Sequence, residues 1–223
     1  MGKACFVTGT DTGIGKTLIA SALVYGYGRR GLKAAGMKPV AAGCVEHEGG
    51  LLSEDVSMLM VAGNVVAPLE IHNPYAFKPA IAPHIAAAQS GVVIRFEAIQ
   101  HAYEELTTLA DMVVVEGVGG FRVPLSDDLD TADMAQALRI PVILVVGMRL
   151  GCLSHALLTV EAIRARGLEL AGWVTNQVDP QMSSYEENLQ ALEQRIAAPC
   201  LGRIPYLTTP DFKLAAEHLR LEI

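Results

Sequence analysis

The sequence lacks the features that mark several classes of protein. Its four cysteines, at positions 5, 44, 152 and 200, include no CxxC pair. A metal cluster or a dithiol redox motif is therefore not indicated, and a reduced cytoplasmic setting is expected. No two of its six histidines have HxxxH spacing, so we expect them to be surface or capping residues. No run of Lys or Arg forms a basic stripe and the formal net charge is −7, which argues against nucleic acid as a partner.

Long hydrophobic runs are also missing. The longest strongly apolar run, IPVILVVGM at residues 140–148, is far shorter than the ~18 residues that a membrane span requires. The apolar run at the N-terminus is too short for a secretory signal. These absences exclude a membrane partner and predict a soluble cytoplasmic protein.

What the chain does contain is a large apolar content. Of its 223 residues 51% are hydrophobic and 18% are charged, which is typical of an ordered globular protein. A chain of this length can bury a sizeable core, and we expect residues 1–223 to form a single domain.

Short apolar runs alternate with helix-length stretches. The runs are continuous, as in strands that are buried on both faces of a parallel sheet. We therefore predict an α/β fold: a doubly wound, mostly parallel sheet with helices on both faces, similar to the P-loop NTPases. The predicted strands are residues 4–9, 33–40, 111–117, 140–147, 170–176 and 199–205, and the predicted helices are 16–30, 54–61, 94–109, 131–138, 153–166 and 185–196. Residues 40–110 are interpreted as an insertion of helices and loops without a confident strand, including a helix that begins near Pro83.

The segment GTDTGIGKT, residues 9–17, follows the first predicted strand and precedes a predicted helix. A glycine loop followed by a helix N-terminus can cradle phosphate, although this loop has one residue more than the usual pattern. Lys16 would then reach the terminal phosphates, and the Thr17 hydroxyl would bind magnesium. The alternative is an ordinary glycine-rich turn.

Ligands of doubly wound folds bind beyond the carboxyl ends of the strands, so the residue that follows each strand matters. Lys38 follows the second predicted strand, on what we expect to be a neighbour of the strand that carries the phosphate loop. Glu116 follows the third and could hold magnesium, or else cap a helix. Asp55 is a second candidate magnesium ligand, although its spacing alone favours a helix N-terminal acid that interacts with the helix dipole. The Asn176 amide ends another strand and suits an adenine edge.

The motifs together resemble the dethiobiotin synthetase family. The similar segments are FVTGTDTGIGKT, AGMKPVAAGC, NPYAFKPAIAPHIAAAQ, VVVEGVGGFRVPLSD, PVILVVGMRLGCLSHALLT and LAGWVTNQV, and they cover most of the chain up to about residue 178. The lengthened loop is the normal form in that family. The resemblance implies an ATP-dependent ligase of biotin biosynthesis that joins CO2 to 7,8-diaminopelargonic acid, through a carbamate and a carbamic-phosphate anhydride, to give dethiobiotin.

The resemblance also implies roles for individual residues. Lys16 steadies the transferred phosphoryl group, Lys38 holds the carbamate, and Mg2+ is bound by Thr17, Asp55 and Glu116. A homodimer is implied, in which the helix start at Leu150, Gly151 and Cys152 takes the substrate carboxylate across the interface; Lys38 and Ala42 are the other expected substrate contacts. The expected ATP-binding residues are Thr12, Gly13, Ile14, Gly15, Lys16, Thr17, Leu18, Asp55, Glu116, Gly117, Val118, Gly119, Asn176, Gln177, Pro205, Tyr206 and Leu207.

Some positions depart from the family pattern. Hydroxyl residues are common where this chain has Ala42 and Ala82, an acid is common at Gly13, and an uncharged residue is common at Arg122. A nucleotide-driven switch of the partition or metallochaperone type is the alternative, but such ATPases place a lysine where this chain has Asp11. A related amide-forming ligase of cobalamin synthesis would need an additional glutamine-hydrolysing domain.

Overall fold

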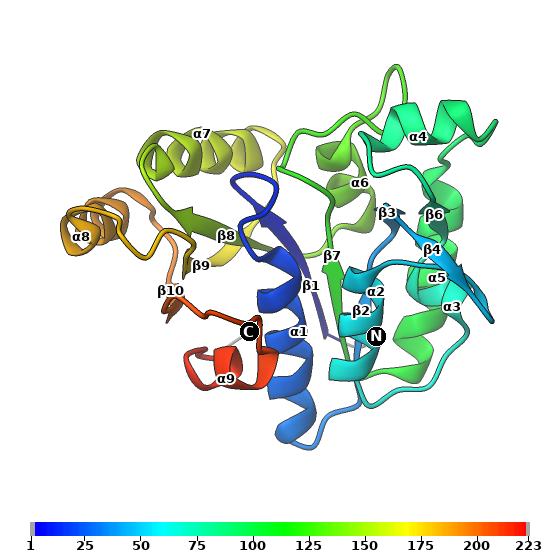
Figure 1. Ribbon diagram of the computed structural model, residues 1–223, viewed down its shortest axis with the longest axis horizontal. Coiled ribbons are helices and arrows are strands. Elements are labelled where there is room, and N and C mark those ends of the chain that lie inside the picture. Colours follow the sequence, from blue (N-terminus) through cyan, green and yellow to red (C-terminus); the bar gives the residue numbers. More distant parts are fainter. Residues whose placement is uncertain (1–2, 222–223) are drawn as a thin grey trace.

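The computed structural model describes residues 3–221, and a parallel sheet of six strands runs through its centre (Figure 1). The strands lie in the order β10-β9-β8-β1-β7-β2, and each adjacent pair is parallel. Their bounds are β1 (Lys3–Gly9), β2 (Ala34–Met37), β7 (Met112–Glu116), β8 (Val142–Met148), β9 (Leu170–Gln177) and β10 (Cys200–Ile204). All six predicted strands and the predicted fold class are thus confirmed.

Helices cover both faces of this sheet. Along β1 and β7 the buried residues alternate between two cores: Phe6 and Val115 face one, and Val7 and Val114 face the other. The second core is closed by α1 (Lys16–Arg29), α2 (Glu54–Ala62) and α9 (Phe212–Glu217). The first is closed mainly by α5 (Phe96–Leu109), α6 (Thr131–Leu138), α7 (Cys152–Ala165) and α8 (Tyr185–Arg195), with α4 (Pro83–Gln89) at its edge.

Two expectations, one for the stretch between β2 and β7 and one for the neighbour of β2, were wrong. Residues 40–110 contain strands: β3 (Val40–Ala42) pairs in parallel with β6 (Tyr75–Phe77), and β4 (Val45–His47) pairs antiparallel with β5 (Gly50–Leu52). The short helix α3 (Leu69–His72) precedes β6. In addition, β2 and β1 are not neighbours, because β7 lies between them. Glu116 therefore stands between Lys38 and the phosphate loop.

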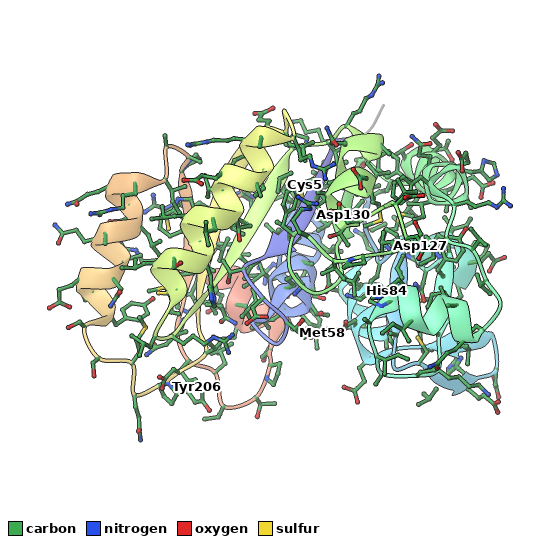
Figure 2. The ribbon with its side chains drawn as sticks, turned by 90° about the horizontal axis from the view of Figure 1, so that it is seen from above. Cys5, Met58, His84, Asp127, Asp130 and Tyr206 are labelled. Carbon is green, nitrogen blue, oxygen red and sulfur yellow. The ribbon has the colours of Figure 1, made fainter. Side chains whose placement is uncertain are left out.

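Figure 2 looks onto the molecule from above the view of Figure 1. Met58 on α2 and His84 on α4 lie close together in this view, whereas Tyr206 lies well away from both.

No helix in the described part of the chain has the length and hydrophobicity needed to cross a bilayer.

Candidate functional site

The glycine loop between β1 and α1 adopts a conformation that depends on its glycines. Gly13 and Gly15 have φ of +72° and +86°, in the left-handed region that disfavours side chains. Gly15 has no room for one either, since a Cβ there would lie 2.2 Å from Nδ2 of Asn176. That amide donates to the Ile14 carbonyl at 2.9 Å. The end of β9 thus supports the loop from below, and α1 begins directly after it.

Lys16, the first residue of α1, is buried beside the loop. Its Nζ donates to the Asp11 carbonyl at 2.9 Å, across the loop itself. Burial lowers the pKa of Lys16 from 10.5 to about 8, against the attraction of Glu116 and with a further contribution from the positive charge of Lys38. The ammonium is therefore held in a site that lacks sufficient negative charge, which a bound anion would supply.

Two residues donate to the carboxylate of Glu116 at the end of β7, and Asp55 joins the cluster through one of them, Lys38. Oε1 accepts from Nζ of Lys38 at 2.7 Å and from the Thr17 hydroxyl at 2.8 Å. Nζ of Lys38 also lies 3.0 Å from Oδ2 of Asp55. Burial disfavours the charge on Lys38, but the attraction of Glu116 and Asp55 outweighs it and raises its pKa. The pKa of Asp55 is lowered, because Lys38 outweighs the opposing effect of burial on this carboxyl.

The second oxygen of Glu116 is the unusual atom of this cluster. Oε2 is buried and has no hydrogen-bond partner within the described residues. A buried carboxylate oxygen is costly to leave unpaired, so this atom calls for a ligand. No group of three His, Cys, Asp or Glu side chains among residues 3–221 could form an all-protein metal centre. Two carboxylates and a hydroxyl do suit Mg2+, which keeps several waters and binds phosphate oxygens as well.

A cavity of about 820 Å³ lies above this cluster. It collects a large part of the predicted site: Thr12, Gly13, Gly15, Lys16, Thr17, Leu18, Lys38, Ala42, Asp55, Glu116, Val118 and Gly119. Ile14 is buried in the loop below, and Gly117 presents its carbonyl 3.4 Å from Nζ of Lys38. The cavity also contains residues that the sequence had not singled out as site residues, namely Glu54, Met58, Ala80, Ile81, Pro83, Val123 and Pro210, together with Ala82. The position of Glu54 beside Asp55 was the one available signal for that residue.

Five of the predicted ATP-binding residues, Asn176, Gln177, Pro205, Tyr206 and Leu207, are not among the residues that line this cavity. Gln177 and Pro205 line a separate hollow of about 660 Å³ with Tyr185, Glu187 and other residues. Tyr206 is half-exposed, and Leu207 packs against the core that α1 closes. The amide nitrogen of Asn176 donates a hydrogen bond to the phosphate loop, a contact that the sequence did not predict.

The segment predicted to take the substrate carboxylate also lies outside the cavity. Leu150 is 96% exposed and Gly151 has φ of +95° at the start of α7. The backbone N–H of Cys152 donates to the Arg149 carbonyl at 3.0 Å. Burial raises the pKa of the Cys152 thiol, contrary to the lowering expected at a helix start, so the thiol is unsuited to nucleophilic attack.

One histidine differs from the expectation that all six are surface or capping residues. His72 is buried, and its Nδ1 lies 2.7 Å from the Gly36 carbonyl of β2. It is therefore a structural residue beneath the strand that leads to Lys38.

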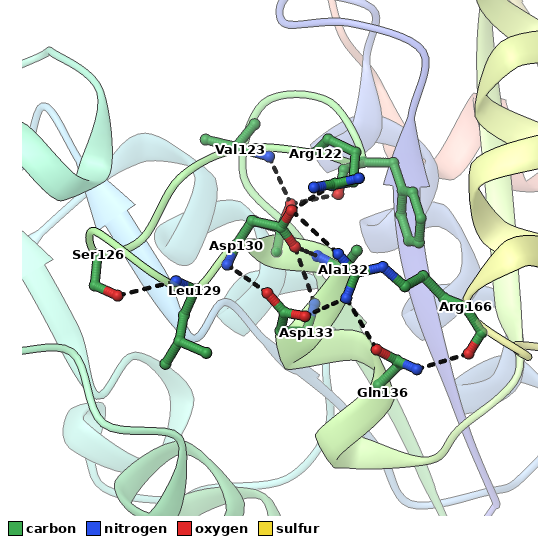
Figure 3. A network of polar contacts seen from close by, with 11 residues as sticks. Arg122, Val123, Ser126, Leu129, Asp130, Ala132, Asp133, Gln136 and Arg166 are labelled. Carbon is green, nitrogen blue, oxygen red and sulfur yellow. Dashed lines mark hydrogen bonds and ion pairs between the residues drawn. The ribbon is translucent and has the colours of Figure 1, made fainter.

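The loop between Glu116 and α6 is fixed by the network drawn in Figure 3. Asp130 caps α6, accepting from the Ala132 N–H at 2.8 Å, and it forms an ion pair with Arg122. Arg166, beyond α7, pairs with Asp133 and lies 3.6 Å from Asp130. Because Val118, Gly119 and Val123 of the same loop line the cavity, this network sets the shape of one cavity wall. It also accounts for Arg122, a departure from the family pattern.

Two solved structures share the arrangement of strands and helices seen here. The MinC:MinD cell division complex of Aquifex aeolicus matches with a TM-score of 0.57 at 15% identity, over 96% of this chain and 86% of that one. The ParA family ATPase of Chlorobium tepidum TLS matches with a TM-score of 0.56 at 13% identity, over 93% and 86%. At such identities the likeness shows the fold alone, and the fold class is P-loop NTPase-like, as predicted.

Sequence comparison gives the family within that class. A family model described as an AAA domain matches residues 3–212. The chain is 55% identical over 219 residues to the ATP-dependent dethiobiotin synthetase BioD of Aromatoleum aromaticum (strain DSM 19018 / LMG 30748 / EbN1), which is 98% of this chain and 97% of that protein. The chain belongs to this AAA domain family and to the ATP-dependent dethiobiotin synthetases.

Proposed function

We propose that this chain is a ligase of biotin biosynthesis that uses ATP, CO2 and 7,8-diaminopelargonic acid to form dethiobiotin. The observation that carries the proposal is the convergence of Lys16, Lys38, Thr17 and Glu116 on one cavity beside the phosphate loop, in a chain with a full-length synthetase relative. Lys16 and Lys38 would be the catalytic residues.

The chemistry requires two anions to approach one another. One amine of the substrate adds to CO2 and forms a carbamate, and a carbamate oxygen then attacks the γ-phosphorus of ATP, with ADP as the leaving group. The second amine closes the ureido ring at the carbamate carbon and expels inorganic phosphate. Two like unit charges ~4 Å apart repel by about 4 kcal/mol at an effective dielectric of 20, so fixed cations must offset the repulsion.

Lys16 and Lys38 are placed to supply those cations from opposite sides. Lys16 lies at the start of α1, where loop N–H groups and the helix dipole also favour phosphate. Lys38 lies at the end of β2, and its raised pKa keeps it charged across the physiological range. In this proposal the Lys38 ammonium holds the carbamate while Lys16 follows the transferred phosphoryl group.

Mg2+ would be held by Thr17, Asp55 and Glu116, and when bound it would neutralise phosphate charge. The unpartnered Oε2 of Glu116 supports this placement. Lys38 and Thr17 together occupy Oε1 of the same carboxylate. Glu116 thereby connects Lys38 and Thr17 with the oxygen that would bind the metal, Oε2, at the end of a fully buried strand.

The remaining assignments follow the family resemblance. The base would lie toward Asn176, Gln177 and residues 205–207, near the hollow that Gln177 and Pro205 line. The substrate carboxylate would be bound at Leu150, Gly151 and Cys152 of the partner subunit of a homodimer. Ala42 contributes a methyl group rather than a hydroxyl to the cavity, so the diamine would make fewer polar contacts there.

The test is an assay with MgATP, bicarbonate and 7,8-diaminopelargonic acid that measures both phosphate release and ring product. We predict that Lys38→Ala lowers turnover by at least about a hundredfold, the usual effect of removing one charge-stabilising group, while MgATP still binds. Lys78→Ala is the matched control, because Lys78 is exposed and its ion pair with Glu46 lies at the protein surface. Lys38→Arg, which preserves the buried charge, guards against a folding defect in the alanine variant.

Either of two results would contradict this proposal. Turnover in Lys38→Ala at the level of the Lys78→Ala control would remove Lys38 from the mechanism. Phosphate release without ring product in the unmodified protein would exclude the ligase and favour a nucleotide-driven switch.

A further inference from the structure

Asp11, in the phosphate loop, is contacted by two cations from different elements. Lys16 donates to its carbonyl at 2.9 Å, and Arg149 forms an ion pair with its carboxylate. The other carboxylate oxygen accepts from the Thr12 N–H at 2.7 Å. Arg149 directly follows the last residue of β8, so the pair joins the loop to a neighbouring strand of the sheet.

The loop does not depend on this pair for its position. The Thr10 N–H donates to the Val145 carbonyl at 3.0 Å, and the Asn176 amide supports Ile14 on the other side. The Asp11 and Arg149 side chains are 43% and 41% exposed, and an ion pair so exposed adds little to folding stability. The contribution of Arg149 is therefore expected to be electrostatic and directed at what the loop binds.

An unpaired carboxylate at position 11 would oppose that binding. Asp11 precedes Thr12, which lines the cavity, so its charge lies at the edge of the space that a triphosphate would enter. We propose that Arg149 is a positioning residue that neutralises Asp11 and draws its carboxylate toward β8, leaving the loop free to accept the triphosphate. This inference rests on the proposed ATP-binding function and assigns Arg149 no contact with the substrate.

Direct measurement of the MgATP dissociation constant in the parent protein and four variants tests the proposal. Arg149→Met leaves Asp11 unpaired and should raise the dissociation constant roughly tenfold at low ionic strength. Asp11→Asn should leave it within about threefold of the parent, since it removes the repelling charge. The Asp11→Asn/Arg149→Met double variant should recover the affinity that Arg149→Met alone loses. Arg149→Lys, which preserves the charge, should bind nearly as well as the parent.

The other patterns each overturn the inference. Equal losses in Asp11→Asn and Arg149→Met would mean that the pair acts by ordering the loop. A double variant as weak as Arg149→Met would mean that the guanidinium binds phosphate itself. Unchanged affinity in every variant would mean that the pair is incidental. Failure of the parent protein to bind MgATP would instead count against the proposed function.

Discussion

Lys16 and Lys38 are both buried, yet their pKa values are shifted in opposite directions. Two carboxylates lie within hydrogen-bond distance of the Lys38 ammonium, and they raise its pKa. Lys16 has a backbone carbonyl as its closest acceptor, and burial lowers its pKa to about 8. Lys38 is thus charged before any ligand arrives, whereas Lys16 becomes fully charged only at lower pH or beside an anion.

This difference predicts a pH dependence of nucleotide binding. In the free protein Lys16 loses its proton as the pH rises through about 8, well below the 10.5 of an unhindered lysine. The cost of keeping it charged destabilises the free fold below pH 8 and is relieved between about pH 8 and 10.5. A bound triphosphate restores the proton, so the MgATP dissociation constant should rise by up to about tenfold per pH unit above pH 8.

Titration calorimetry at pH 7 and pH 9, in buffers of different ionisation enthalpy, checks this expectation. Close to one proton should be taken up on binding at pH 9, and little at pH 7. Lys16→Met should abolish the uptake. Binding at pH 9 without proton uptake in the unmodified protein would show that Lys16 is charged in the free site.

At this scale the sequence identified residues whose position follows from a strand end. Lys16, Thr17, Lys38 and Glu116 come together because the carboxyl ends of parallel strands share one edge. The pairing of Asp11 with Arg149 could not be predicted. The phosphate-loop pattern leaves the residue at position 11 unspecified, and the contact with Arg149 depends on which strand lies next to β1.

Among the elements, the loop from β7 to α6 depends on a single side chain. Asp130 caps α6 and also pairs with Arg122, and its side chain is 12% exposed. We predict that Asp130→Ala lowers the free energy of unfolding by about 2–4 kcal/mol, chiefly through loss of the cap and of the hydrogen bonds to this carboxylate. The exposed Arg122 contributes less, because solvent screens its charge.

Urea unfolding of Asp130→Ala beside Asp127→Ala tests this estimate. Asp127 is exposed in the same loop, so its replacement should change stability by less than about 0.5 kcal/mol. Asp130→Asn, which can still cap the helix, should fall between the two. Equal stability of the two alanine variants would show that the network in Figure 3 does not hold the loop.

The elements of the main sheet were predictable, and so were α2, α4 and α5, whereas the strands between residues 40 and 110 were not. The central strands β1, β7 and β8 are mainly apolar and are buried along almost their whole length, which leaves a clear pattern in the sequence. The strands β3 to β6 have three residues each, and β4 is exposed throughout. Segments of three residues are too short to show an alternation of apolar and polar residues, and their pairing is set by tertiary contacts.

For the whole molecule, the fold alone leaves the function open, because a cell division protein complex and a ParA family ATPase match it at 15% and 13% identity. The proposed homodimer bears on this question, since a partner subunit would supply the carboxylate-binding segment. Leu158, on α7, is 62% exposed, and Leu150, just before α7, is 96% exposed. We predict that Leu158→Glu shifts the protein from dimer to monomer and abolishes ring formation while MgATP binding is preserved.

Sedimentation equilibrium measures the oligomeric state of Leu158→Glu, and the turnover assay on the same protein measures its ring formation. Val66→Glu is the control, because Val66 is 97% exposed on a loop far along the chain from α7. A monomeric parent protein with full activity would contradict the role of the partner subunit. A dimeric Leu158→Glu variant would place the interface on another face.

The contact between Asn176 and Gly15 has an evolutionary consequence. The Asn176 amide occupies the volume in which a side chain at position 15 would begin, so the two positions share one space although they lie far apart in the sequence. Neither can be enlarged alone, and a smaller residue at 176 would leave the Ile14 carbonyl without its donor. Homologues are therefore expected to inherit the two residues jointly, and to exchange them, where they do, as a pair.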